Sequence, residues 1–222
     1  MSVHQRIAIT GASGLIGTAL VGHLKAEGHT VQRLVRRAPV GADEVQWDPQ
    51  TGFVDLEPLR GVDAVIHLAG VGVGDKRWSK KYKSEILNSR LLGTTAIANA
   101  VTELKPQVFI SASAIGWYGE SGNRAVVETD RVGDDFLAAV CREWEAAADL
   151  AQDVRTVKIR TGLVLDPTGG ALGKMLPLFR LGLGGKLGNG KQWWSWITLH
   201  DQLRAIIFAL ENPISGPVNL TA

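Results

Sequence analysis

Three hydroxyl side chains lie close together in the stretch Ser111-Ala-Ser-Ala-Ile-Gly-Trp-Tyr118. The apolar run from Gln107 to Ser113 predicts a buried strand, so Ser111 and Ser113 stand at its carboxyl end and Tyr118 follows shortly after. Serine and tyrosine hydroxyls can donate or accept a proton at a reacting oxygen. The spacing therefore predicts a proton-handling site, with Ser113 and Tyr118 as candidate catalytic residues.

A glycine-rich stretch near the N-terminus indicates that the protein binds a phosphate-bearing ligand. Its sequence is Arg6-Ile-Ala-Ile-Thr-Gly-Ala-Ser-Gly-Leu-Ile-Gly17. A β-branched run ends at Gly11, and helical apolar spacing begins just past Gly14. Gly11 allows a tight turn, Gly14 lets the backbone approach a pyrophosphate, and Gly17 lets the helix pack on the strand. Free amides at the helix start would face the anion. The pattern also occurs as a plain strand-to-helix turn, but the strand before it and the helix after it favour a dinucleotide site.

The second predicted strand, Thr30 to Val35, ends in Arg36 and Arg37. In a dinucleotide-binding fold the tip of this strand faces the adenosine ribose, where an acidic side chain binds the 2′-hydroxyl and an arginine suits a 2′-phosphate. Val35 occupies the position expected for the acid, and Arg36 follows it. We therefore predict NADP rather than NAD, with Val35 and Arg36 at the ribose. The alternative is that both arginines are only solvated loop residues.

The apolar run from Asp63 to Gly70 predicts a buried strand. Its carboxyl end should lie beside the cofactor, because ligands of doubly wound sheets bind where the strand order reverses. Leu68, Ala69 and Gly70 are therefore candidate cofactor contacts. His67 lies inside the strand, and we interpret it as a packed, hydrogen-bonded residue without a role in chemistry.

Helical spacing predicts one long helix from Trp78 to Leu104. Glu85 and Arg90 lie in its first half, where they could reach the cofactor, and a solvated position is the alternative for each. We also predict a cofactor contact from Val164, in a sixth strand expected over Arg155 to Leu165. The expected inward stripe of the long helix is Leu87, Leu91, Thr94, Ala98 and Val101.

The remaining elements follow from the same patterns of apolar spacing and turn residues. They are a short strand from Glu44 to Trp47, a helix from Asp134 to Leu150, an apolar segment from Leu172 to Leu183, a final helix from His200 and a last strand from Gly216 to Leu220. Trp193, Trp194 and Trp196 follow a glycine-rich stretch. These tryptophans could line a substrate pocket, form a small satellite core or face a partner.

Composition limits the function classes. The 222 residues carry a net charge of +2, with 45% apolar and 21% charged residues, which are ordinary values for one globular α/β domain. These values argue against a disordered, fibrous or membrane class, and the scattered basic residues argue against general nucleic-acid binding. The single cysteine, Cys141, and the isolated histidines have no metal-ligand spacing. No apolar signal core or membrane-length run is present, so we expect a cytoplasmic protein.

Several segments together resemble the extended short-chain dehydrogenase/reductase superfamily, and within it the NAD-dependent epimerase/dehydratase group. The resemblance covers nearly the whole chain and implies a Rossmann-type α/β fold, a doubly wound parallel sheet with helices on both faces. Extended members add a small C-terminal substrate lobe, which we expect to be truncated or absent here, and they often pair, which leaves a homodimer open. The segments are TGASGLIG, SASAIGWYGESG, DFLAAVCREWEAAA, RTGLVLDPTGGALGKMLPLFRLGLGGKLGNGKQWWSWITLHD and GPVNLTA.

When the family's site residues are placed on this sequence, the resemblance implies that Arg36 contacts the 2′-phosphate of NADP. It places Ser113 at the family's catalytic serine or threonine, and Arg90 where extended members usually have an asparagine near the active site. The phosphate contacts that it implies come from Gly11, Ser13, Gly14, Leu15 and Ile16.

The catalytic pair of the family is missing from this sequence. Redox-active members use Tyr-x-x-x-Lys on the helix after the fifth strand, where the lysine lowers the pKa of the tyrosine. Here the corresponding helix carries Leu137 and Cys141, and the residue four positions after Tyr118 is Gly122. The standard acid/base pair is therefore absent.

Two functions remain open. The first is an NADP-binding oxidoreductase or epimerase-like enzyme that acts on an unidentified small substrate with a hydroxyl or keto group, sugar-like molecules being one class. The second, motivated by the missing pair, is a non-catalytic NADP(H)-binding sensor or regulatory protein. We expect a single Rossmann-like domain over residues 1–222, with residues 166–200 as a substrate-side insertion.

Overall fold

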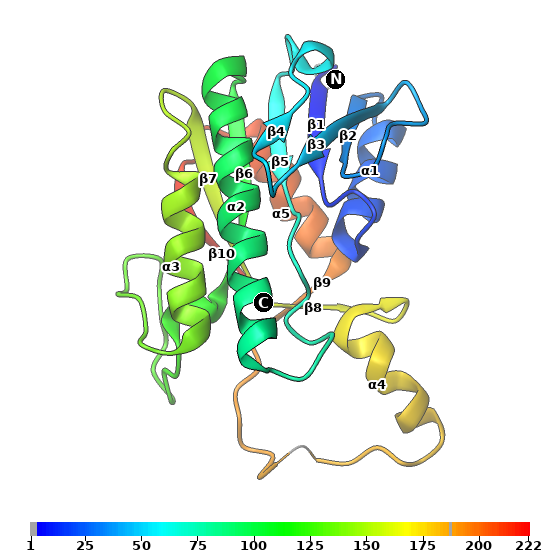
Figure 1. Ribbon diagram of the computed structural model, residues 1–222. Coiled ribbons are helices and arrows are strands. Elements are labelled where there is room, and N and C mark those ends of the chain that lie inside the picture. Colours follow the sequence, from blue (N-terminus) through cyan, green and yellow to red (C-terminus); the bar gives the residue numbers. More distant parts are fainter. Residues whose placement is uncertain (1–3, 187) are drawn as a thin grey trace.

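An eight-stranded sheet runs through the computed structural model, which describes residues 4–186 and 188–222 (Figure 1). Its strands are β1 (Arg6–Thr10), β2 (Thr30–Val35), β3 (Glu44–Asp48), β4 (Phe53–Val54), β5 (Ala64–His67), β6 (Val108–Ala114), β7 (Arg155–Thr161) and β10 (Gly216–Leu220). They lie side by side in the order β10-β7-β6-β5-β1-β2-β3-β4. Every neighbouring pair is parallel except β3 and β4, which are antiparallel. The sequence patterns did not predict the two-residue strand β4.

Helices cover both faces of this sheet. They are α1 (Leu15–Ala26), α2 (Lys80–Leu104), α3 (Phe136–Ala148), α4 (Gly170–Arg180) and α5 (Leu199–Glu211), with short 3-10 turns at Glu57–Leu59 and Ile115–Tyr118. Alternate side chains of β6 enter two separate cores. Ile110 packs in one core with α1 and α5, whereas Phe109 packs in the other with α2 and α3. The expected doubly wound α/β fold is therefore confirmed.

The strand order reverses at β1. The chain goes from β1 to β2 on one side, and β5 then pairs with the other side of β1. The β1–β5 register brings Thr10 opposite His67, so the two strands end together. Ligands of open α/β sheets bind in the crevice outside such a reversal. Gly11 and Leu68, the residues that follow the two strands, therefore lie where a ligand is expected to bind.

The predicted sixth strand, Arg155 to Leu165, is wrong as one element. The structure divides it into β7 in the main sheet and β8 (Leu163–Asp166), which pairs with β9 (Trp196–Thr198) in a separate two-stranded sheet. The break falls at Gly162, whose N–H donates to Leu220 O at 3.0 Å while Leu163 N–H donates to Ser195 O at 2.8 Å. A long-range partner therefore ends the strand inside an apolar run that has no local breaking signal other than one glycine.

The inward stripe predicted for the long helix is partly wrong. Thr94, Ala98 and Val101 are buried, but Leu87 and Leu91 are only half-buried. The packed positions in the first half of α2 are instead Tyr82 and Ile86, which join Val140 of α3 in a third core cluster. The buried residues of the second half, such as Ala98 and Val101, lie in a different core from Tyr82 and Ile86, so one straight stripe cannot describe the helix.

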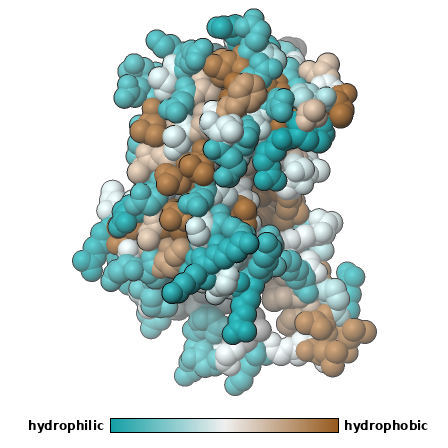
Figure 2. Space-filling model, in the orientation of Figure 1, coloured by the Kyte–Doolittle hydropathy of each residue, from teal (hydrophilic) through white to brown (hydrophobic). Residues whose placement is uncertain are grey.

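The segment after β8 leaves its apolar side chains exposed. Helix α4 has no buried residue, and Figure 2 shows an apolar patch at its end of the molecule. Trp193 is 77% exposed and Trp194 and Trp196 about 40%, so the three tryptophans do not form a satellite core. The patch residues on and just after α4 are Leu178, Phe179, Leu181 and Leu183.

Candidate functional site

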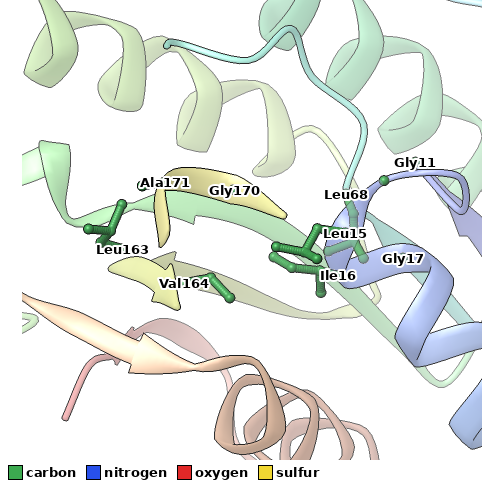
Figure 3. A pocket seen from close by; sticks show the side chains of 10 residues that line it. Gly11, Leu15, Ile16, Gly17, Leu68, Leu163, Val164, Gly170 and Ala171 are labelled. Carbon is green, nitrogen blue, oxygen red and sulfur yellow. The ribbon is translucent and has the colours of Figure 1, made fainter. Parts of the chain in front are cut away.

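A cavity of about 290 Å³ lies at the carboxyl ends of β1 and β5 (Figure 3). Figure 3 shows Leu15, Ile16 and Leu68 gathered beside the first turn of α1, while Leu163 and Val164 approach from β8. The cavity thus joins the predicted phosphate loop to the predicted contact Val164. Its lining residues are Gly11, Gly14, Leu15, Ile16, Gly17, Leu68, Leu163, Val164, Gly170 and Ala171.

Close backbone approach explains two of the three loop glycines. Gly11 has a φ of +68°, and a Cβ on it would lie 2.8 Å from the carbonyl carbon of Leu68. A Cβ on Gly17 would lie 2.1 Å from the oxygen of Gly11. Since both obstacles are backbone atoms, neither can move aside cheaply. Only glycines allow this loop to close against β5, and the absence of side chains leaves its backbone accessible to an anion such as a pyrophosphate.

The first turn of α1 leaves its amides free. Its N-cap is Gly14, which offers no capping side chain, and the first turn contains no acidic residue. By contrast α2, α3 and α5 are each capped by a side chain, from Ser79, Asp135 and Thr198. Uncapped N–H groups and the helix dipole together attract an anion. Ser13 is exposed within the same loop.

The two arginines after β2 have different surroundings. Arg37 makes a bidentate pair with Glu44 at 2.7 and 2.6 Å, and this hydrogen bonding holds the pKa of Glu44 well below its usual range. Arg36 is exposed and has no ion pair with any residue that the structure describes. Val35 is half-buried at the strand end. Of the two side chains, Arg36 is the one free to meet a ligand.

Thr10 of β1 makes hydrogen bonds with the residues at the end of β5. The Thr10 hydroxyl accepts hydrogen bonds from Leu68 N–H at 3.1 Å and from Ala69 N–H at 3.3 Å. The same oxygen is 2.7 Å from His67 Nδ1. His67 is fully buried, and its burial and hydrogen bonding confirm that it is a packed residue. Leu68 and Ala69 are therefore held in place beside the glycine loop.

Because His67 is buried as the neutral form, protein stability should depend on pH. Burial lowers the pKa of His67 from 6.5 to about 3. Between these values the unfolded chain binds a proton that the folded chain does not, so stability falls as the pH drops below about 6.5. We expect the free energy of unfolding, measured with urea, to be about 2 kcal/mol lower at pH ~5 than at pH ~7.5. In the variant His67→Gln this difference should largely vanish, and a variant that keeps it would assign the effect to other groups.

The two candidate catalytic residues, Ser113 and Tyr118, meet in a buried polar network. Ser113 Oγ donates to Glu145 Oε1 at 2.6 Å, and Glu145 is in turn bound by Arg160 through Nε at 2.8 Å and Nη2 at 3.0 Å. Tyr118 accepts a 3.0 Å hydrogen bond from Arg160 Nη1 and donates to Asn219 Oδ1 at 2.6 Å. Neither Ser113 nor Tyr118 lines the glycine-loop cavity. The structure brings the two hydroxyls together without placing them against that cavity.

Sequence reasoning missed the ion pair at the centre of this network. Arg160 is 2% exposed and its guanidinium lies 4.0 Å from the ring centroid of Trp117, while Glu145 is 4% exposed. The carboxylate raises the pKa of Arg160 despite the opposing effect of burial. The available signal was a charged residue at a buried position in each of two apolar elements, since Glu145 follows the packed Trp144 and Arg160 follows the buried Ile159.

The positions that correspond to the family's Tyr-x-x-x-Lys pair lie close to the turn after β6. A Cβ on Gly116 would be 3.3 Å from Leu137 Cβ and 3.5 Å from Cys141 Sγ. Burial raises the pKa of the Cys141 thiol to about 12, and the thiol donates to Ala114 O at 3.6 Å. Neither side chain can act as the missing acid or base at neutral pH.

Glu85 and Arg90 differ in their surroundings. Glu85 is half-buried and pairs with Lys76 at 3.6 Å in the loop before α2, so it turns toward this loop and does not line the cavity. Arg90 lies behind Gly70, where a Cβ would be 3.5 Å from the guanidinium carbon. Gly70 follows the pocket residue Leu68 by two positions, so Arg90 lies near the predicted cofactor site.

Residues 4–186 and 188–222 contain no cluster of three or more histidine, cysteine or acidic side chains that could hold a metal ion. None of the helices in these ranges has the length and hydropathy of a membrane span.

Comparison with known proteins agrees with this geometry. A family model described as "NAD dependent epimerase/dehydratase family" matches residues 7–221. The epimerase family protein Mb2239 of Mycobacterium bovis is 47% identical over 218 residues, which are 97% of this chain and 72% of that protein.

Two solved structures resemble the chain over nearly its whole length. A nucleoside-diphosphate sugar epimerase from Corynebacterium glutamicum has a TM-score of 0.87 at 39% identity, covering 99% of this chain and 47% of the other. Human epimerase family protein SDR39U1, crystallised with NADPH, also has a TM-score of 0.87 at 36% identity, covering 98% of this chain and 74% of the other.

Proposed function

Because the chain belongs to the NAD-dependent epimerase/dehydratase family, we propose that it binds NADP(H) beside β1 and acts as an oxidoreductase or epimerase-like enzyme. Its substrate in this proposal is a small molecule with a hydroxyl or keto group. The observation that carries the proposal is the uncapped first turn of α1, closed against β5 by glycines that admit no side chain. The presence of NADPH in the human relative's crystal structure supports the choice of cofactor.

The residues of the loop fit such a cofactor. In the proposal the amides from Ser13 to Ile16 hold the pyrophosphate and Arg36 holds the 2′-phosphate. Leu68 and Ala69 contact the rest of the cofactor. The start of α4 covers the loop, since a Cβ on Gly169 would lie 3.1 Å from a Leu15 methyl group. Residues 166–200 would then act as the substrate-side insertion of a single domain over residues 1–222. Bound NADP(H) supplies a hydride acceptor or donor, whereas this chain supplies orientation and proton handling.

The variant Arg36→Ala tests the choice of NADP. Removing the guanidinium removes charge-assisted hydrogen bonds to the 2′-phosphate, which NADH lacks. We expect the ratio of NADPH to NADH affinity to fall roughly 10–100-fold, because each such interaction contributes about 1.5–3 kcal/mol. The measurement is a fluorescence titration of wild type and variant with both nucleotides.

The neighbouring arginine provides the control for this prediction. Arg37→Met removes a guanidinium that is already engaged by Glu44, so the nucleotide preference should change much less than in Arg36→Ala. An unaltered ratio in Arg36→Ala would show that Arg36 is a solvated loop residue and would leave the preference for NADP without its physical basis.

Proton handling is assigned to Ser113 and Tyr118 in this proposal. Ser113 donates its proton toward Glu145, so the lone pairs of its oxygen remain available to a substrate hydroxyl. The test is hydride exchange between bound NADPH and a panel of aldehydes, ketones and nucleotide sugars, followed by absorbance of the nicotinamide. Turnover of any panel member establishes an enzyme.

The second candidate is a non-catalytic NADP(H)-binding sensor. It is favoured by one observation, namely that Leu137 and Cys141 stand at the positions of the family's acid/base pair. Tight NADPH binding without turnover of any panel member would support it. In that case Ser113→Ala and Tyr118→Phe should leave NADPH affinity unchanged.

A further inference from the structure

Five cations stand close together around the start of α2, between Asp75 and Glu85. The two acidic residues of this stretch do not neutralise them all, because each acid is already paired. Asp75 contacts Lys174 of α4 at 3.2 Å, and Glu85 contacts Lys76 at 3.6 Å. The four cations that are left exceed the net charge of +2 of the whole chain. They are Arg77, Lys80, Lys81 and Lys83.

Three of these four cations are exposed to solvent. Arg77, Lys80 and Lys81 form no ion pair with any carboxylate in residues 4–186 and 188–222. Lys83 is half-buried instead, and its ammonium group lies 4.9 Å from the ring centroid of Phe136. We call Arg77, Lys80 and Lys81 the basic cluster.

The local fold gives no reason for this charge. Lys80 and Lys81 are the first two residues of α2, and the first turn of the helix contains no acidic residue. Cations are unfavourable at a helix N-terminus, because the helix dipole is positive there. The helix is capped by Ser79, whose hydroxyl accepts a hydrogen bond from Tyr82 N–H at 3.1 Å. The two lysines therefore destabilise the start of α2, which indicates a role in binding rather than in folding.

The basic cluster lies on the same edge of the sheet as the glycine-loop cavity. It follows β5, and Leu68, just past the carboxyl end of this strand, lines the cavity. The loop from β5 to α2 lies against α4, since Lys174 Nζ donates to Gly74 O at 3.5 Å (Figure 1). Gly170, one helical turn or about 6 Å before Lys174, lines the same cavity. At low ionic strength the field of the cluster therefore reaches the cavity.

We propose that the basic cluster steers the anionic cofactor toward the glycine-loop cavity and so raises the rate at which it associates. Charges of one sign beside a binding site raise the local concentration of an oppositely charged ligand. NADP(H) carries a pyrophosphate and a 2′-phosphate, so it responds strongly to such a field. The cluster makes no contact with the bound cofactor in this proposal. The inference rests on the proposed function, and it assigns the cluster to the association step of that binding.

Stopped-flow fluorescence of NADPH binding tests the inference, because it separates association from dissociation. The double variant Lys80→Glu, Lys81→Glu should lower the association rate constant roughly 3–10-fold at about 20 mM ionic strength and leave the dissociation rate constant unchanged. At about 0.5 M the difference from wild type should fall below about 2-fold, because salt screens the field. NADH lacks the 2′-phosphate, so the same variant should slow its association less.

The opposite end of the same helix provides a matched control. Lys105 is exposed and lies about 37 Å along α2 from the basic cluster. Lys105→Glu changes the net charge as much as Lys81→Glu does, but it should leave the association rate constant unchanged. Lys81→Glu alone should lower this rate constant roughly 2–3-fold at low ionic strength. The two substitutions in the cluster place an acid in the first turn of α2, where it is favourable, so these variants should fold.

The outcomes separate this inference from the proposed function. If wild type binds NADPH but the double variant associates as fast as wild type at low ionic strength, the inference is overturned while the cofactor site stands. A change in the dissociation rate constant alone would show direct contact with the cofactor, which also overturns the inference. So would an equal effect of Lys105→Glu and Lys81→Glu, because net charge would then set the rate. If wild type binds no NADPH at equilibrium, the proposed function fails, and this inference fails with it.

Discussion

Gly17→Ala is expected to destabilise the protein by about 3 kcal/mol, at the upper end of the cost of inserting a methyl group into packed structure. The new Cβ would stand 2.1 Å from the oxygen of Gly11 and 2.8 Å from Ala12 Cα, so the glycine loop must shift as a whole. Since the same shift moves the amides that we propose to hold the pyrophosphate, NADPH affinity should fall roughly 10–100-fold. Urea unfolding and a fluorescence titration with NADPH measure the two effects.

The same helix offers a matched control. A Cβ on Gly22 has no neighbour within 4 Å. Gly22→Ala should therefore stabilise the protein by about 0.5–1 kcal/mol through helix propensity alone, with NADPH affinity unchanged. If Gly17→Ala behaved like Gly22→Ala, close packing of α1 on the loop would not be what requires glycine at position 17.

A second loop variant separates binding from folding. A Cβ on Gly14 would lie 3.4 Å from Gly11 O, an ordinary contact distance, and the φ of Gly14 is −79°. Gly14→Ala should consequently fold normally and still bind NADPH less tightly, because the methyl group occupies the approach to the pyrophosphate. Unchanged NADPH affinity in this folded variant would remove the loop from the proposed site.

Glu145→Gln should have the other large effect, on stability. The substitution would leave the Arg160 guanidinium buried without its carboxylate, and breaking a buried ion pair from one side costs about 3–5 kcal/mol. We expect this loss in the free energy of unfolding measured with urea. The variant also removes the carboxylate that accepts the Ser113 hydroxyl hydrogen bond, so any turnover should be lost with it.

A double variant distinguishes pairing from simple packing. Glu145→Gln combined with Arg160→Met removes both charges, so its loss of stability should be clearly smaller than the sum of the two single losses. Glu57→Gln, in the exposed pair with Arg60, should have no measurable effect. Additive single losses at Glu145 and Arg160 would mean that the two charges do not stabilise each other.

Local patterns were sufficient wherever neighbours in sequence decide the structure. The order of strand, glycine turn and helix from Arg6 to Ala26 follows from side-chain periodicity and from three glycines, all within one short segment. The buried strands β5 and β6 follow from apolar runs, and the parallel sheet follows from strands that alternate with helices. The resemblance of several segments led to the same family that the comparisons show.

Contacts between distant residues decided the rest. Glu145 and Arg160 come from different elements, and nothing in the sequence near Ser113 or Tyr118 indicates that this pair joins them. Arg36 and Arg37 are adjacent and identical in type, yet Glu44 on the next strand binds only the second. The division of β7 from β8 likewise depends on Ser195 and Leu220.

The sequence by itself determined the fold and the position of the glycine loop, because periodicity and glycine spacing act over a few residues. Only the tertiary structure decided which charged side chains are neutralised and which remain free. Charge pairing depends on distance in space, and chain folding brings Arg160 to Glu145 while it leaves Arg90 beside Trp144 and Gly70. No local pattern in the sequence encodes that outcome, because the partners come from elements that are far apart along the chain.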